Sequence, residues 1–123
     1  MPGTIKIRPV SAHLSENFEG ADRLDPYCKF SVGSCIGRTS VVKHSGKNPG
    51  WNETITLEKK DKDTNCYIEL KDKGRFLFDG RVGEAKIDLR PVLMRGKMTQ
   101  WFNLTHRKEL AAEILLEITY EPH

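Results

Sequence analysis

The cysteine and histidine side chains are the first candidates for chemistry, because they are common nucleophiles, bases and zinc ligands. The chain has three cysteines, Cys28, Cys35 and Cys66. No two of them form a CxxC arrangement, and none of the four histidines has zinc-binding spacing to another. The chain also has no GxSxG, HExxH or phosphate-cradling glycine motif. We therefore predict a protein that is not an enzyme, with buried, reduced thiols.

A short apolar run surrounded by basic residues lies between Lys71 and Gly80, a stretch that reads as a loop. The apolar residues are Phe76, Leu77 and Phe78, and the flanking cations are Lys73, Arg75 and Arg81. Three consecutive apolar residues on an exposed loop are unusual. The combination predicts insertion into a membrane interface, with the cations meeting anionic headgroups. Two rival interpretations are a hydrophobic contact for a protein partner and aromatic rings folded back over the protein.

Short strand-like runs must position these residues. Apolar and polar residues alternate in many of the runs, and turn residues separate them. The predicted strands are residues 4–10, 27–32, 36–43, 51–58, 66–70, 82–89, 100–104 and 113–120, with one helical turn within 90–97. No amphipathic helix of normal length is visible, and parallel crossovers need such helices. The pattern predicts an all-β, eight-stranded antiparallel sandwich.

Composition sets the broad class. The 123 residues fit one domain, with 37% hydrophobic and 30% charged residues. The net charge of +3 does not by itself require nucleic acid or membrane. The aromatic residues do not alternate with basic ones as a nucleic-acid stacking platform needs, so we expect no nucleic-acid partner. Because no signal peptide or membrane-spanning run is visible, we expect a cytoplasmic setting and at most peripheral membrane contact.

Several motifs, in order along the chain, resemble those of the C2 domain family. They are Asp25-Pro26-Tyr27, Asn48-Pro49-Gly50-Trp51-Asn52-Glu53, Val82-Gly83-Glu84-Ala85 and Gln100-Trp101-Phe102-Asn103-Leu104. The resemblance implies a single C2 domain over residues 1–123, built as a Greek-key β-sandwich. One strand precedes the first predicted binding loop and a strong strand ends the chain, which is similar to the type II arrangement of the family.

The resemblance also implies a calcium site, because many C2 domains bind calcium through about five carboxylates on two loops. The matching positions here carry Glu19, Asp25, Asp72 and, one residue early, Asp79, whereas Gly74 stands where another carboxylate is expected. Calcium takes six to eight oxygen ligands, and nearby cations oppose its binding. We therefore expect a degenerate site that binds calcium weakly or not at all, and no other cofactor.

A basic face is a second feature that the resemblance implies, because many C2 domains bind phosphoinositides through lysines on two neighbouring strands. The candidates are Arg38, Lys43, Lys47, Lys59, Lys60 and Lys62. The rival interpretation is a charged, solvated edge that resists aggregation. The predicted function is therefore a non-catalytic module that docks on anionic phospholipid membranes with weakened or absent calcium dependence. The alternative is a structural or adaptor subunit that binds a protein partner.

Overall fold

The computed structural model describes residues 2–16, 24–43, 46–73 and 80–123. Within these residues the chain forms eight strands and one short helix. In chain order they are β1 (Gly3–Leu14), β2 (Pro26–Val32), β3 (Cys35–Arg38), β4 (Ile55–Lys59), β5 (Asn65–Asp72), β6 (Gly80–Asp88), α1 (Arg90–Arg95), β7 (Lys97–His106) and β8 (Glu109–Pro122). No helix of these described segments is long and apolar enough to cross a membrane.

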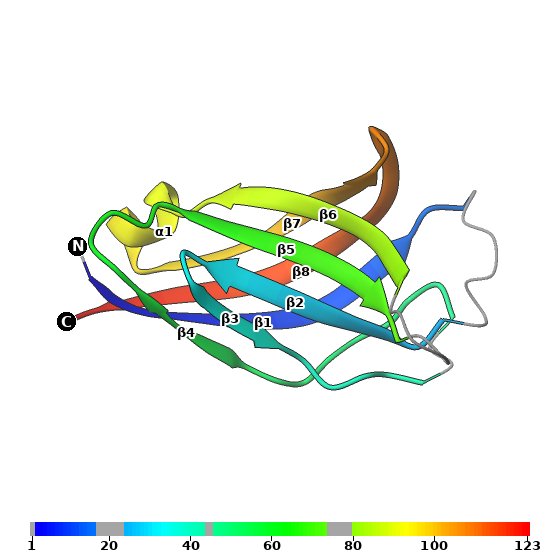
Figure 1. The fold of residues 1–123 in the computed structure, drawn as a ribbon, viewed down its shortest axis with the longest axis horizontal. Helices are drawn as coiled ribbons and strands as arrows, with labels where there is room; N and C mark the ends of the chain where they lie inside the picture. The colour runs from blue at the N-terminus through cyan, green and yellow to red at the C-terminus, as the bar shows by residue number, and fades with distance from the viewer. Residues whose placement is uncertain (1, 17–23, 44–45, 74–79) are drawn as a thin grey trace.

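The strands form two layers that face each other (Figure 1). The hydrogen-bonded order is β3-β2-β5-β6-β7-β8-β1-β4, with antiparallel neighbours throughout. Among the described residues only the pair Glu84–Thr105 joins β6 to β7, so the order divides there into two four-stranded halves. The two end strands of this order, β3 and β4, also lie close to each other. A Cβ atom added to Gly37 would lie only 2.6 Å from Ile55 Cγ2. This is the eight-stranded antiparallel Greek-key sandwich that the sequence predicts.

The core lies between the two halves and follows the period of two along each strand. In β8, Ile114, Leu116 and Ile118 are fully buried while the residues between them are half-buried. Trp51 also belongs to this core and is only 5% exposed. Cys28 and Cys66 are buried free thiols, as predicted, whereas Cys35 is only half-buried, so the prediction was wrong for this residue. Each fully buried large aliphatic side chain contributes about 1.5–3 kcal/mol, so the alternation explains why the halves pack together.

Two predicted strands are shorter in the structure. Residues 36–43 and 51–58 were expected to be extended, but only Cys35–Arg38 and Ile55–Lys59 are strands. Beyond Arg38 the chain still follows β2, because the N–H of Thr39 donates to Cys28 O at 2.9 Å and that of Val42 to Pro26 O at 3.0 Å. The predicted helical turn is confirmed as α1, which ends at Arg95 and is capped by Gly96 with φ of 83°.

The sandwich has two distinct ends (Figure 1). At one of them β1 and β5 finish and β2 and β6 begin, and we call it the loop end. The hairpin between β7 and β8 also lies there, because β7 runs antiparallel to β6. We call the opposite one the terminal end, where Gly3 pairs with both Lys59 and Pro122. Helix α1 lies at the terminal end, so the predicted binding loops are far from it along the strands (Figure 1).

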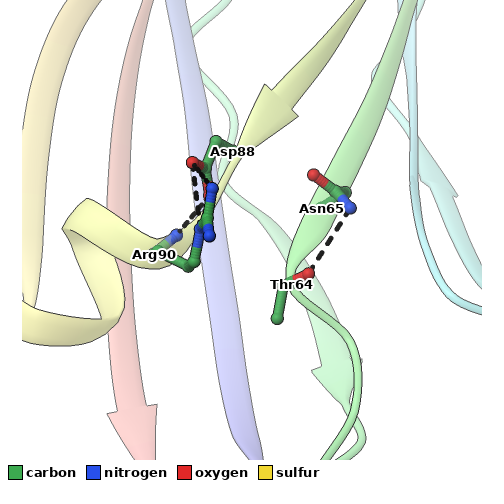
Figure 2. Close-up of polar contacts among 4 residues, drawn as sticks. All are labelled: Thr64, Asn65, Asp88 and Arg90. Atoms are coloured by element: carbon green, nitrogen blue, oxygen red, sulfur yellow. Dashed lines mark hydrogen bonds and ion pairs between the residues drawn. The ribbon is translucent and has the colours of Figure 1, made fainter.

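The terminal end carries a bidentate ion pair between Asp88 and Arg90 (Figure 2). Arg90 Nε lies 3.0 and 3.1 Å from the two carboxylate oxygens of Asp88, and Nη2 lies 2.8 Å from Oδ2. Beside it, Asn65 Nδ2 donates to Thr64 Oγ1 at 3.4 Å (Figure 2). The side-chain hydrogen bond from Arg90 lowers the pKa of Asp88 from 3.8 to about 2.

We expect the substitution Arg90→Gln to return the Asp88 pKa toward 3.8, because the largest cause of its depression is then removed. A pKa that is lower in the folded than in the unfolded protein stabilises the fold above pH 3.8, and this contribution is lost as the pH falls toward 2. An NMR titration of the Asp88 carboxyl carbon in both proteins measures the shift. A midpoint near 2 in the variant would contradict the assigned cause.

Candidate functional site

Two of the predicted calcium ligands, Asp25 and Asp72, lie next to each other at the loop end. Pro26, directly after Asp25, pairs with Asp72 across β2 and β5. The N–H of Asp25 donates to Asp72 Oδ1 at 2.9 Å, and the N–H of Lys73 donates to Asp25 O at 2.9 Å. The antiparallel register therefore brings together two aspartates that are 47 residues apart in the sequence.

These two carboxylates do not by themselves make a calcium site. The other predicted ligands, Glu19 and Asp79, lie outside the described residues. Among the described residues, no group of three or more metal-ligating side chains is found. One oxygen of Asp72 already accepts a backbone hydrogen bond, and calcium needs six to eight oxygen ligands. Whatever completes the coordination shell must come from beyond the described residues or from a ligand.

The predicted insertion tip also lies outside the described residues. It consists of Arg75, Phe76, Leu77 and Phe78. Its role in a membrane interface therefore stays a prediction. The residues on either side, Lys73 and Gly80, are described and exposed at the loop end.

A small hollow of about 140 Å³ lies near the loop end, and we call it the cationic recess; one of its lining residues, Lys73, directly follows Asp72. Tyr27, Arg38 and Lys73 line it together with residues 39–41. The Arg38 guanidinium carbon lies 5.6 Å from the centre of the Tyr27 ring, a distance that suits a cation–π contact. Tyr27 is 3% exposed, so its ring forms a fixed floor beneath the guanidinium. The recess thus presents one guanidinium and one ammonium at its walls.

Two further lysines, Lys29 and Lys71, extend the positive charge of the recess along the outer face of β2 and β5. Lys29 pairs with Arg38, and Lys71 pairs with Tyr27, so all four side chains belong to the same face. Neither lysine was predicted from the sequence to bind lipid. The alternation of β2 could have indicated Lys29, because this residue lies on the strand face opposite to the buried Cys28 and Phe30.

The predicted basic face is not one surface. Arg38 borders the cationic recess, and Lys43 is exposed next to Val42, which bonds to Pro26 near the loop end. Lys59 and Lys60 instead lie at the terminal end, because Lys59 pairs with Gly3. The expectation that Lys59 is displayed is corrected: it is 2% exposed, and its ammonium donates to Lys60 O at 2.9 Å.

Arg81, predicted to meet headgroups, is held by carboxylates on the sheet. Its Nε lies 2.9 Å from Glu69 Oε2 and its Nη1 lies 3.2 Å from Glu84 Oε2. Tyr67 donates its hydroxyl to Glu84, and this hydrogen bond raises the Tyr67 pKa. The side chains of Glu69 and Arg81 are 10% and 48% exposed, so the carboxylate depends on this guanidinium for a counter-charge.

Comparisons with known proteins agree with this geometry. The family model described as "C2 domain" matches residues 3–104. Elicitor-responsive protein 3 of Oryza sativa subsp. japonica is 30% identical over 121 residues, which cover 98% of this chain and 84% of that protein. A solved C2 domain-containing protein has a TM-score of 0.88 and 28% identity, covering 98% of this chain and 90% of its own. A calcium-bound structure of two C2 domains from extended synaptotagmin 2 has a TM-score of 0.76 and 26% identity, covering 98% of this chain and 46% of its own.

Proposed function

This chain belongs to the C2 domain family, and from that premise we propose that it is a non-catalytic module that docks peripherally on anionic phospholipid membranes. We propose further that the docking takes place on cytoplasmic membrane surfaces and depends weakly or not at all on calcium.

The observation that carries the proposal is the cationic recess with its neighbouring lysines. Arg38 and Lys73 line the recess, and Lys29 and Lys71 lie beside it. A guanidinium offers two parallel N–H groups to a phosphate, and an ammonium adds a mobile point charge. Each cation near an anionic surface contributes about 1 kcal/mol. Four cations on one face together contribute about 4 kcal/mol, which corresponds to salt-sensitive docking in the millimolar range.

Weak calcium dependence follows from the charges around the acidic pair. Asp25 and Asp72 are close together, but the ammonium-bearing Lys73 follows Asp72 directly and adds positive charge where calcium would bind. In the proposed mode, fixed cations meet the headgroups that a calcium ion bridges in other members of the family. Phe76, Leu77 and Phe78 then add apolar insertion next to them.

The proposal of a non-catalytic role is supported by the environment of two thiols. Burial raises the pKa of the Cys66 thiol to about 12 and that of Cys28 well above 9.0. A thiol needs to ionise to act as a nucleophile, so raised pKa values make both poor candidates. We propose that these residues serve packing.

A direct test is sedimentation of the purified protein with phosphatidylcholine vesicles, with and without phosphatidylserine or phosphoinositides. We expect binding to the anionic vesicles in both calcium and chelator, and loss of most binding as salt rises, because exposed charges are screened. Binding only in calcium would overturn the proposed calcium independence. No binding under any condition would overturn the membrane function.

A second candidate function, docking on a protein partner, is favoured by Trp101. Its side chain is 49% exposed on the outer face of β7, directly opposite Leu115 on β8. Exposed tryptophan is enriched among residues that dominate protein interfaces. Absence of vesicle binding, together with co-fractionation in a large complex that Trp101→Ala abolishes, would favour this adaptor function.

A further inference from the structure

The hairpin between β7 and β8 has an unusual turn. Its two central residues, Arg107 and Lys108, have φ of 52° and 69°. Two-residue hairpins with two positive φ angles strongly prefer Asn-Gly, because a side chain is strained in the left-handed region. Both residues are exposed, so packing does not explain why long cationic side chains occupy this turn. Conformational strain that packing does not require points to a role for the side chains themselves.

The turn is displayed where the proposed membrane contact lies. In Figure 1 the hairpin is the orange to brown segment that curves outward near the loop end, beside the end of β1. The N–H of Ser15, just after β1, donates to Ala111 O at 2.9 Å and fixes the hairpin against that strand. The hairpin extends from the β7–β8 half, whereas the cationic recess is on the β2–β5 half. Both therefore lie toward the loop end, on opposite halves of the sandwich.

The hairpin offers more than charge. Leu110 is 48% exposed, and a hollow of about 290 Å³ adjoins it, with His106 and Glu109 also in its lining. Arg107 and Lys108 extend beyond this hollow at the turn. An exposed aliphatic side chain next to two cations is the combination that binds at the boundary between headgroups and acyl chains.

We propose that the β7–β8 hairpin is a second contact with anionic lipid headgroups, in which Arg107 and Lys108 bind phosphate or carboxylate groups and Leu110 enters the interface. The inference rests on the proposed membrane function and adds a site to it. A bilayer is the occupant that the placement favours, because two cationic sites on opposite halves of the sandwich share one end. With two separated contacts the domain is held in one orientation rather than pivoting about the recess.

Three double variants test the proposal in the vesicle assay. R107Q/K108Q removes both charges but still places a residue with a long side chain at each of the two strained positions. R107N/K108G removes the charges and supplies the residues that the turn prefers. K60Q/K62Q removes two exposed lysines at the terminal end and is the charge-matched control.

We expect both hairpin variants to bind phosphatidylserine vesicles about thirtyfold more weakly than the parent protein, since two cations leave the surface. The control should bind as the parent does. R107N/K108G should also melt roughly 5 °C higher than the parent, because strain is released. Weaker binding together with higher stability would separate loss of contact from loss of folding.

Failure of the inference can be told apart from failure of the proposed function. If the parent protein binds no vesicles, the membrane function itself is wrong. If the parent binds and both hairpin variants bind equally well, the hairpin is not a lipid contact and an acidic protein surface becomes the better partner for it. Equal weakening by K60Q/K62Q would also overturn the inference, because net charge rather than position would then control binding.

Discussion

Replacing the four cations of the recess face with glutamine is expected to weaken binding to phosphatidylserine vesicles by about a thousandfold, because each contributes about 1 kcal/mol. The variant carries K29Q, R38Q, K71Q and K73Q. The four residues come from β2, β3 and β5 and from the residue after β5. Arg38 and Lys73 line the hollow, and register places Lys29 and Lys71 on the same face as Arg38. Sedimentation at low and at physiological salt gives the two affinities and the loss of salt dependence that should accompany them.

A matched variant at the terminal end controls for net charge. K60Q, K62Q, R95Q and K97Q remove the same number of exposed cations from the opposite end of the sandwich. We expect this protein to bind within a few-fold of the parent. Equal losses in the two quadruple variants would show that binding follows net charge alone and would contradict a defined lipid-binding face. Circular dichroism would confirm that both variants keep the fold.

Replacing Arg81 with methionine is expected to lower the free energy of unfolding, by less than the cost of breaking a fully buried ion pair. The substitution leaves the Glu69 carboxylate, whose side chain is 10% exposed, without the guanidinium 2.9 Å away. Breaking a fully buried ion pair costs about 3–5 kcal/mol. The value here is lower because the Arg81 side chain is 48% exposed and water moderates the loss. Urea denaturation of the variant and the parent protein measures the difference.

Two further variants make that prediction specific. Lys86→Met removes an exposed cation from the same strand and should change stability by less than about 0.5 kcal/mol. Adding Glu69→Gln to Arg81→Met should recover part of the loss, because the stranded charge is then removed. No recovery in the double variant would show that packing by the Arg81 stem, rather than the charge of Glu69, explains the cost. Vesicle binding should change little, since the Arg81 guanidinium is paired with Glu69 and Glu84 on the sheet.

The sequence predicted the fold well where alternation is strong. The run within β8 alternates between buried and half-buried residues, and it was assigned to a strand correctly, as were the runs within β2 and β5. Residues 39–43 were assigned to a strand and are not one, although Thr39 and Val42 still bond to β2. A segment that runs alongside a strand without forming regular ladder pairs can have the same composition as a strand. Only its backbone geometry distinguishes it from a true strand.

The candidate site was less predictable, because it depends on which strands become neighbours. Lys29 and Lys71 belong to the recess face only through the pairing of β2 with β3 and β5. Lys59 looked exposed from its charge, yet backbone carbonyls of the following loop satisfy its ammonium. The pairing of Arg81 with Glu69 likewise follows from the packing of β5 against β6.

The pairing of β1 with β8 delays folding of the chain during its synthesis. Residues 3–14 find their partner in residues 109–122, and β4 has only β1 as a hydrogen-bonded neighbour in the described sheet. During synthesis, β1 and β4 must therefore wait for β8 before their half of the sandwich can close. Closing so long a loop is slow, and the waiting strands have exposed edges that invite aggregation. A ribosome-bound chain should stay protease-sensitive until β8 has left the exit tunnel.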